Sequence, residues 1–264
     1  MPPIPSSKAD IDCASVSADL KYPITRYATD NMDLYAFQRM IRDPLASRPF
    51  VIENAVDQWP ALSSRPWANL EYLRVVVGHN RLVPVELGAK YTDSDWTQEL
   101  MAFGRFIDEI VYPSADKTGK SGYMAQHDLA SQAPRLRRDF WIPDYTLVDT
   151  GRYIQASGDG DPGNGGVQTN VWFGPKGTVS PLHYDRSDNL FVQVVGCKYF
   201  RFYSPEESRR IYAHSQCSLL QNTSQVDVGC PDLAKYPLFE QAQYTECVVR
   251  PGDMLYIPVS ATEM

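Results

Sequence analysis

The second half of the chain is a succession of short β-rich segments, and this pattern constrains the fold more than any other feature. Turn-forming residues such as Gly174-Pro175, Gly196 and Pro251-Gly252 separate several of the segments. The segments span residues 167–173, 179–185, 189–195, 198–203, 247–250 and 254–258. Regular short strands with intervening turns are typical of a β-sandwich or β-barrel. The pattern therefore predicts such a fold for this half.

The first half predicts an α+β arrangement. Residues 33–41 and 69–77 place apolar residues at helical spacing, and a glycine follows the second of these segments. Residues 48–56 and 81–87 are predicted as strands. We expect a further helix over residues 96–112, where six apolar side chains lie largely on one helical face.

No repeat of fixed period and no linker divides the chain. We expect residues 1–30 to be a polar, poorly ordered N-terminus and residues 31–264 to form a single, mainly β (α+β) domain. Residues 156–166 are too rich in glycine and aspartate to pack, and are predicted as a surface loop.

Charge and composition exclude several classes of function. Lysine and arginine number 25 against 32 acidic residues, so the formal charge of −7 does not favour nucleic-acid binding. No apolar run approaches the ~20 residues that span a bilayer, and the start of the chain resembles neither a signal peptide nor an anchor. Five widely spaced cysteines without a C-x-x-C pair fit reduced thiols in an intracellular protein.

His183 and Asp185 form the clearest chemical pair of the sequence. Side chains alternate along a strand, so these two point to one face and Tyr184 points to the other. An imidazole and a carboxylate, joined by a second histidine, form the facial triad that holds iron(II) and leaves coordination positions open. A 2-oxo acid and dioxygen fill those positions in such sites. The alternative is a hydrogen-bonded His-Asp couple on the surface.

Lys198 places a long cationic side chain in an apolar neighbourhood that includes Val194 and Phe200. Burying an ammonium group is costly unless an anion meets it, and the far carboxylate of 2-oxoglutarate is such an anion. The alternative is a surface lysine whose apolar stem alone is buried. Ser180 and Asn189, taken alone, are more typical of turn or capping residues.

Residues 171–185 and 189–199 closely resemble the JmjC oxygenases, and among them the small JmjC proteins described both as protein arginyl hydroxylases and as lysine demethylases. The resemblance covers roughly residues 46–259. Its landmarks outside the central run are Arg48-Pro49-Phe50, Trp59-Pro60, Val83-Pro84-Val85-Glu86, Tyr91-Thr92-Asp93, Gly122 to His127, Ile142-Pro143-Asp144-Tyr145 and Asn222 to Asp227.

The resemblance implies a cupin-like double-stranded β-helix, or jelly roll, with helices packed outside. It also implies Fe(II), 2-oxoglutarate and O2 as cofactors, hydroxylation or demethylation of arginine or lysine side chains of a protein or peptide, and a location in the nucleus, the cytoplasm or both. The implied residues are His183 and Asp185 for iron, Tyr123, Ser180, Asn189 and Lys198 for 2-oxoglutarate, and Gln126 and Trp172 for the substrate pocket. For His127 and His214 we expect structural roles.

The sequence departs from the family after residues 251–259. There the family continues to a Trp-His pair whose histidine is the third iron ligand, whereas this chain has Thr262 and Glu263 at those positions. We expect Glu263 to be poorly fixed, the third ligand and the last strands to be missing, and the chain to be a truncated product. The alternative function is therefore a JmjC-like binding module that keeps the 2-oxoglutarate pocket but binds iron weakly.

Overall fold

The computed structural model describes residues 20–42, 48–88, 96–113, 121–148, 167–214, 220–259 and 261–263. The chain forms two compact units. Of the described residues, the larger unit holds 20–58, 142–148 and 181–263, and the smaller holds 59–141 and 167–180.

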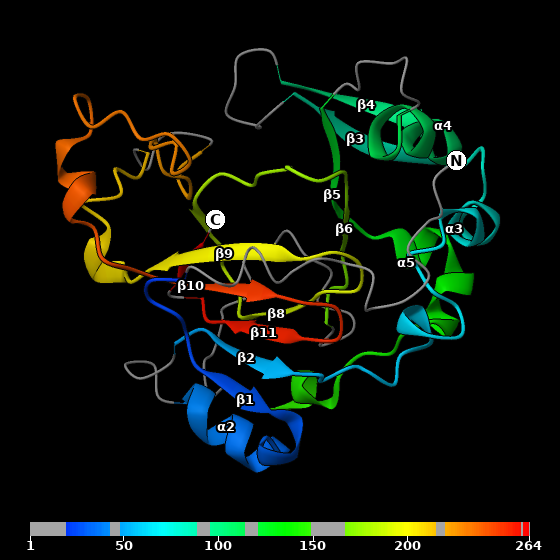
Figure 1. Cartoon of the computed structure of the whole chain (residues 1–264), viewed down its shortest axis with the longest axis horizontal. Helices are drawn as coiled ribbons and strands as arrows, with labels where there is room; N and C mark the ends of the chain where they lie inside the picture. The colour runs from blue at the N-terminus through cyan, green and yellow to red at the C-terminus, as the bar shows by residue number, and fades with distance from the viewer. Residues whose placement is uncertain are drawn as a thin grey trace. The chain divides into compact units, whose positions relative to one another are not determined.

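Two four-stranded sheets form the larger unit (Figure 1). The first has the order β1 (Arg26–Ala28), β2 (Phe50–Glu53), β11 (Met254–Ile257) and β8 (Asn189–Val192). The second has the order β10 (Tyr244–Val249), β9 (Lys198–Tyr203), β12 (Thr262–Glu263) and β7 (His183–Tyr184). All neighbours are antiparallel except β1 and β2.

A single apolar layer joins the two sheets. Alternation along each strand sends every second side chain inward. Val51 and Leu255 of the first sheet pack with Phe200 and Phe202 of the second. The rings of Phe191 and Phe200 meet edge to face across the layer, with centroids 5.0 Å apart. Two facing sheets around one core confirm the predicted mainly β, jelly-roll type of fold.

The outer face of the first sheet is covered by helix α2 (Leu34–Arg42). Phe37 and Ile41, one helical turn apart, pack on the outward-facing Phe50. The carboxylate of Asp33 accepts a hydrogen bond from the backbone N–H of Ala36 at 2.6 Å and so caps the first turn. This helix confirms the prediction for residues 33–41.

The smaller unit contains one antiparallel sheet, in the order β4 (Thr97–Ala102), β3 (Leu82–Leu87), β5 (Gly122–His127) and β6 (Val171–Phe173). Its core gathers Val83, Phe103, Phe106, Met124 and Leu136. Its helices are α3 (Leu70–Val77), α4 (Phe103–Phe106), a π-helical turn (Ile107–Val111) and α5 (Leu129–Gln132). Short 3-10 turns lie at Pro60–Leu62 and Pro134–Arg138 here, and at Thr29–Asn31, Asp144–Leu147, Pro205–Glu207 and Pro237–Gln241 in the larger unit.

Helix α3 confirms the prediction for residues 69–77. The side chain of Asn69 caps its N-terminus by accepting from the backbone N–H of Tyr72 at 3.1 Å. Gly78, with φ +99°, ends it in a conformation that other residues rarely adopt.

The predicted helix over residues 96–112 is wrong in its first half. Strand β4 occupies Thr97–Ala102 and pairs with β3 along its whole length, and helical structure begins at Phe103. Strand β1 likewise lies within the segment for which no regular element was expected, and β5 was not predicted. The expectation of a single domain over residues 31–264 stays a prediction, and the predicted loop at 156–166 lies outside the described residues.

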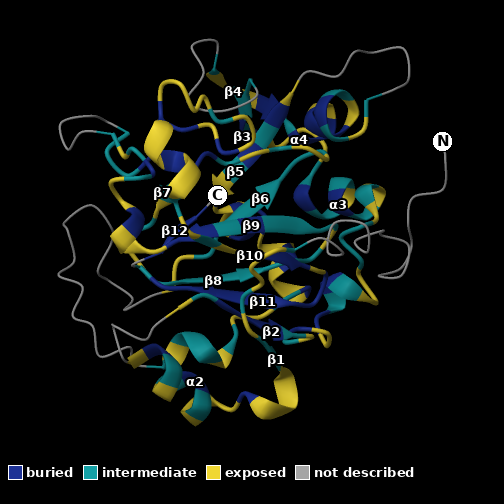
Figure 2. Ribbon diagram, turned by 60° about the vertical axis from the view of Figure 1, so that its left-hand side comes forward, coloured by how far each residue is buried: buried dark blue, intermediate teal, exposed yellow. Residues whose placement is uncertain are grey.

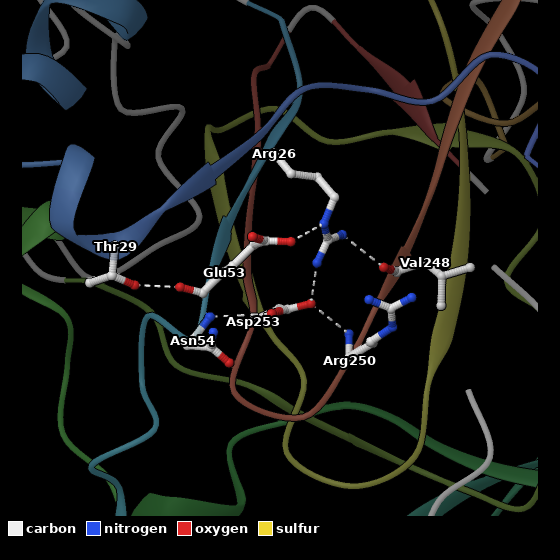
Figure 3. Close-up of polar contacts among 7 residues, drawn as sticks. All are labelled: Arg26, Thr29, Glu53, Asn54, Val248, Arg250 and Asp253. Atoms are coloured by element: carbon white, nitrogen blue, oxygen red, sulfur yellow. Dashed lines mark hydrogen bonds and ion pairs between the residues drawn. The ribbon is translucent and has the colours of Figure 1, made fainter. Parts of the chain in front are cut away.

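A polar network fastens strand β1 to the turn before β11 (Figure 3). Arg26 donates to the carboxylates of Glu53 at 2.7 Å and Asp253 at 2.6 Å, and to the carbonyl oxygen of Val248 at 3.1 Å. The Asp253 carboxylate also accepts from the backbone N–H of Arg250 at 3.1 Å. Strands far apart in sequence are thereby held together.

The cysteines correct one expectation. Cys197 is disulfide-bonded, so the thiols are not all reduced, whereas Cys230 and Cys247 are free. Among the described residues, no helix is both long and apolar enough to cross a membrane.

Candidate metal centre

Strand β7 positions His183 and Asp185. It lies between β12 and the segment containing Thr223, which forms a bridge to His183. The Nδ1 atom of His183 lies 2.8 Å from the carbonyl oxygen of Pro181. Since a carbonyl oxygen only accepts, this contact assigns the proton to Nδ1 and leaves the lone pair on Nε2. That Nε2 atom lies 3.9 Å from Oδ1 of Asp185.

Strand β12 brings Glu263 to the same place. The strand pairs with β7 on one side and with β9 on the other (Figure 2), and Glu263 stands opposite both His183 and Phe202. Residues directly opposite each other in an antiparallel pair project from one face of the sheet. Glu263 therefore shares the face of His183.

The approach to β12 is also fixed. The backbone N–H of Val259 donates to Oδ1 of Asp188 at 2.9 Å, and that of Ala261 donates to the carbonyl oxygen of Pro258 at 2.9 Å. These bonds and the two strand pairings correct the expectation that Glu263 is poorly fixed.

One ligand atom from each of His183, Asp185 and Glu263 lies within 4.8 Å of the others. Glu263 is only 5% exposed, and its buried Oε2 atom has no hydrogen-bond partner among the described residues. Burial and the charge of Asp185 raise the pKa of Glu263 to about 7, against an opposing effect of Lys198. Imidazole and carboxylate donors converging on one point fit a divalent transition metal such as iron(II) or manganese(II).

Lys198, at the start of β9, faces the same interior. Alternation places it with Phe200 and Phe202, and hence with Glu263. Its Nζ atom lies 5.2 Å from the ring centroid of Phe191 and 5.1 Å from that of Phe200. Burial lowers the pKa of Lys198, and the charge of Glu263 opposes this effect. Lys198 is therefore half-buried, with its ammonium group close to two aromatic rings.

Asn189 belongs to the other sheet of the same unit. It lies on strand β8 opposite Ile257, two residues from Phe191, so its side chain starts from the inward face. The larger unit thus gathers His183, Asp185, Asn189 and Lys198 of the predicted residues, and adds Glu263.

The smaller unit contains the other predicted residues. Tyr123 lies on β5 opposite Glu86, and burial, together with the Glu86 charge, raises the pKa of its hydroxyl. Its ring packs on Gly174, where a Cβ atom would come within 2.6 Å of Cδ2 of Tyr123. The glycine that follows Trp172-Phe173 is therefore required by the tyrosine.

Gln126 is exposed, with φ +49°, at the register irregularity of β5, where a bulge redirects its side chain. Trp172 is half-buried on β6, and Ser180 is half-buried at the last residue of this unit. His127 is buried. The roles predicted for these residues stay predictions.

Counting along the sequence placed Glu263 at the position of the third ligand, but it could not show what holds that residue in place. Residue 263 is held by the pairing of β12 with strands that lie about 60 and 80 residues earlier, and local sequence does not reveal such a pairing.

A family model described as a cupin-like domain matches residues 40–260 of the chain. "Lysine-specific demethylase 8" of Danio rerio is 46% identical over 226 residues, covering 86% of this chain and 51% of that protein. "Lysine-specific demethylase JMJ30" of Arabidopsis thaliana is 40% identical over 220 residues, covering 81% and 46%. The chain thus spans about half the length of these two relatives.

A more distant relative covers a larger share of its own length. "Bifunctional peptidase and (3S)-lysyl hydroxylase JMJD7" of Homo sapiens is 27% identical over 240 residues, covering 80% of this chain and 71% of that protein.

Proposed function

Because this chain belongs to the cupin-like domains of the JmjC group, we propose that it is an iron(II)- and 2-oxoglutarate-dependent oxygenase that acts on side chains of a protein or peptide. The observation that carries the proposal is the convergence of His183, Asp185 and Glu263 on the face of the sheet that also carries the half-buried Lys198. A metal site beside an anion-binding group is what a chelating, doubly anionic cosubstrate requires.

Each residue has a distinct task. His183 and Asp185, with Glu263, hold the metal, and the protonated Nδ1 of His183 fixes the orientation of its ring through Pro181. Within the larger unit, Lys198 would bind the far carboxylate of 2-oxoglutarate, with a hydrogen bond from Asn189. Bound iron(II) and 2-oxoglutarate would supply the oxidising chemistry: 2-oxoglutarate would lose carbon dioxide and become succinate with one oxygen atom of O2, and the other oxygen atom would enter the substrate.

We propose arginine or lysine side chains as the substrates. Two of the relatives are named lysine-specific demethylases and a third a lysyl hydroxylase. Hydroxylation of a carbon that is attached to a methylated nitrogen ends in loss of that carbon, so one reaction accounts for both names. With a formal charge of −7, the chain is proposed to contact protein rather than nucleic acid, in the nucleus or cytoplasm.

A binding module that takes up 2-oxoglutarate without turnover is the second candidate. The carboxylate at position 263 favours it, because the site then lacks a second imidazole and differs in charge from the facial triad of two histidines and one carboxylate.

Succinate formation separates the two candidates. The full chain, supplied with iron(II), 2-oxoglutarate and a methylated-lysine or arginine peptide library in air, is expected to form succinate. His183→Ala is expected to abolish succinate formation, since it removes the imidazole from the three-residue site of His183, Asp185 and Glu263. His214→Ala, a matched change elsewhere in the larger unit, is expected to form succinate as the unaltered chain does. Tight 2-oxoglutarate binding by the unaltered chain without succinate would instead establish the binding module.

A further inference from the structure

We infer that the carboxylate of Glu263 is the third protein ligand of the metal, so that the centre consists of one histidine and two carboxylates and is electrically neutral with a divalent cation. The inference deepens the proposed function and rests on it only for the choice of metal.

The backbone gives the first argument. Glu263 lies on a strand that is hydrogen-bonded to β7 and β9, directly opposite His183. Register in a sheet fixes which face a side chain takes, and a slip by one residue would turn Glu263 away from the site. The ligand atoms of His183, Asp185 and Glu263 lie within 4.8 Å of one another, a spacing that one ion can bridge.

Burial gives the second argument. Glu263 is almost fully buried, and its Oε2 atom has no hydrogen-bond partner among the described residues. A buried carboxylate beside a second carboxylate costs free energy unless a cation or a donor meets it. Lys198 attracts Glu263 electrostatically, yet among the described residues the Oε2 atom of Glu263 has no hydrogen-bond partner. The position nearest to all three groups therefore calls for a cation.

Charge counting shows how this centre differs from one with two imidazoles. A divalent ion with two carboxylates and a neutral imidazole has no net charge, whereas one carboxylate and two imidazoles leave +1. Oxygen donors suit manganese(II), and imidazole suits nickel(II) and copper(II). Glu263 is therefore expected to shift the preference of the site toward manganese(II).

Manganese(II) is the probe for this inference, because its free ion is measured directly by electron paramagnetic resonance without turnover. The full chain is titrated under nitrogen, alongside Glu263→Gln, Glu263→His and the control Glu240→Gln, which removes one exposed carboxylate of the same unit. Loss of an outer-shell partner alone costs 10–100-fold in metal affinity, so Glu263→Gln is expected to weaken manganese(II) binding by at least about tenfold. Glu240→Gln is expected to bind as the unaltered chain does.

Metal preference gives a second readout. Glu263→His supplies an imidazole nitrogen as the third donor, so this variant is expected to bind manganese(II) more tightly than Glu263→Gln does. Its ratio of nickel(II) affinity to manganese(II) affinity is expected to be higher than that of the unaltered chain, because imidazole suits nickel(II). Melting of each variant without metal establishes that it is folded. The melting temperature of Glu263→Gln is expected to equal or exceed that of the unaltered chain, since the buried charge is gone.

Equal manganese(II) affinities of the unaltered chain and of a folded Glu263→Gln would overturn the inference. It would also be overturned if the unaltered chain bound manganese(II) no more tightly than His183→Ala does. Failure of the proposed function looks different: manganese(II) binding then depends on Glu263 as described, but no succinate forms with iron(II).

Discussion

At the scale of single residues, the ammonium group of Lys198 is the charge in the interior of the larger unit that most needs a counterion. It lies close to the rings of Phe191 and Phe200, whose faces attract a cation but do not replace the hydrogen bonds of water, and Glu263 attracts it electrostatically. A carboxylate offers both charge and acceptors. The residue is therefore expected to matter more for ligand binding than for folding.

Replacing Lys198 by methionine tests this expectation. A hydrogen bond to a charged group contributes about 1.5–3 kcal/mol, so 2-oxoglutarate binding is expected to weaken roughly 10- to 100-fold. The free energy of unfolding without ligand is expected to stay equal or rise, because a partly desolvated charge is removed. Calorimetric titration with 2-oxoglutarate and urea unfolding measure the two effects.

The exposed Lys235→Met, in the same unit, is the matched control and is expected to change neither quantity. Equal affinities of the Lys198 and Lys235 variants would contradict an anion-binding role.

Local sequence made His183, Asp185 and Lys198 candidates, because their spacing and their apolar neighbours are visible within 20 residues, and the family resemblance gave them their predicted roles. The fixed position of Glu263 was not predictable in this way. It depends on two strand pairings whose partners lie about 60 and 80 residues earlier in the chain.

At the scale of secondary-structure elements, strand β1 shows how a short segment is held by polar contacts. Three residues pair with β2 in parallel, and Arg26 links that pair to Asp253 at the start of β11 (Figure 3). The Asp253 side chain is buried and accepts from Arg26 and from two backbone N–H groups, whereas the Glu53 side chain is half-exposed.

This asymmetry predicts unequal effects of two substitutions. Asp253→Ala removes one of the three acceptors of a partly buried guanidinium and the acceptor of two backbone N–H groups, and is expected to lower the free energy of unfolding by about 3–5 kcal/mol. Glu53→Ala removes a solvent-screened partner of the same arginine and is expected to cost about 1 kcal/mol or less. Urea unfolding of both variants measures the difference, and similar costs would show that Asp253 is not the central acceptor.

The error over residues 96–112 has a physical cause. Phe103, Phe106, Ile107 and Ile110 follow helical spacing and are buried, as expected. Leu100 and Met101 extend the same spacing by coincidence, because Met101 is buried in a strand and Leu100 is exposed on its other face. Pairing with β3 thus overrode the local pattern.

At the scale of the whole molecule, segments from both ends of the described chain meet in the larger unit. Strands β1 and β2 share a sheet with β11, and the backbone of Lys21 and Tyr22 donates to the Glu246 carboxylate on β10 at 2.6 and 3.2 Å. The hydroxyl of Tyr199 donates to the other oxygen of that carboxylate at 2.6 Å. Contacts between residues so distant in sequence form late in folding, so folding is expected to be slow.

Glu246 makes the stability of this arrangement depend on pH. Burial would raise its pKa, but the hydrogen bonds from Tyr199, Tyr22 and Lys21 outweigh burial and lower it. A lowered pKa in the folded state means that the unfolded chain binds more protons. The stabilisation is therefore present above the ordinary glutamate pKa of about 4.3 and is lost as pH falls through the folded value.

The free energy of unfolding is accordingly expected to decline less steeply below about pH 4.3 in Glu246→Gln than in the unaltered chain. Tyr199→Phe, which removes one of the donors, is expected to lie between the two. Urea unfolding at a series of pH values measures the slopes, and identical slopes for the unaltered chain and Glu246→Gln would contradict the assignment.

The two-sided pairing of strand β12 has a consequence for protein engineering. Its place depends on backbone hydrogen bonds and on the register with β7 and β9, not on the identity of the side chain at position 263. The position of residue 263 in the sheet and the chemical nature of its side chain are therefore specified separately. A panel of aspartate, cysteine and histidine at this one position would present different donors at a constant site, and so offers a calibrated series for tuning an artificial metalloenzyme.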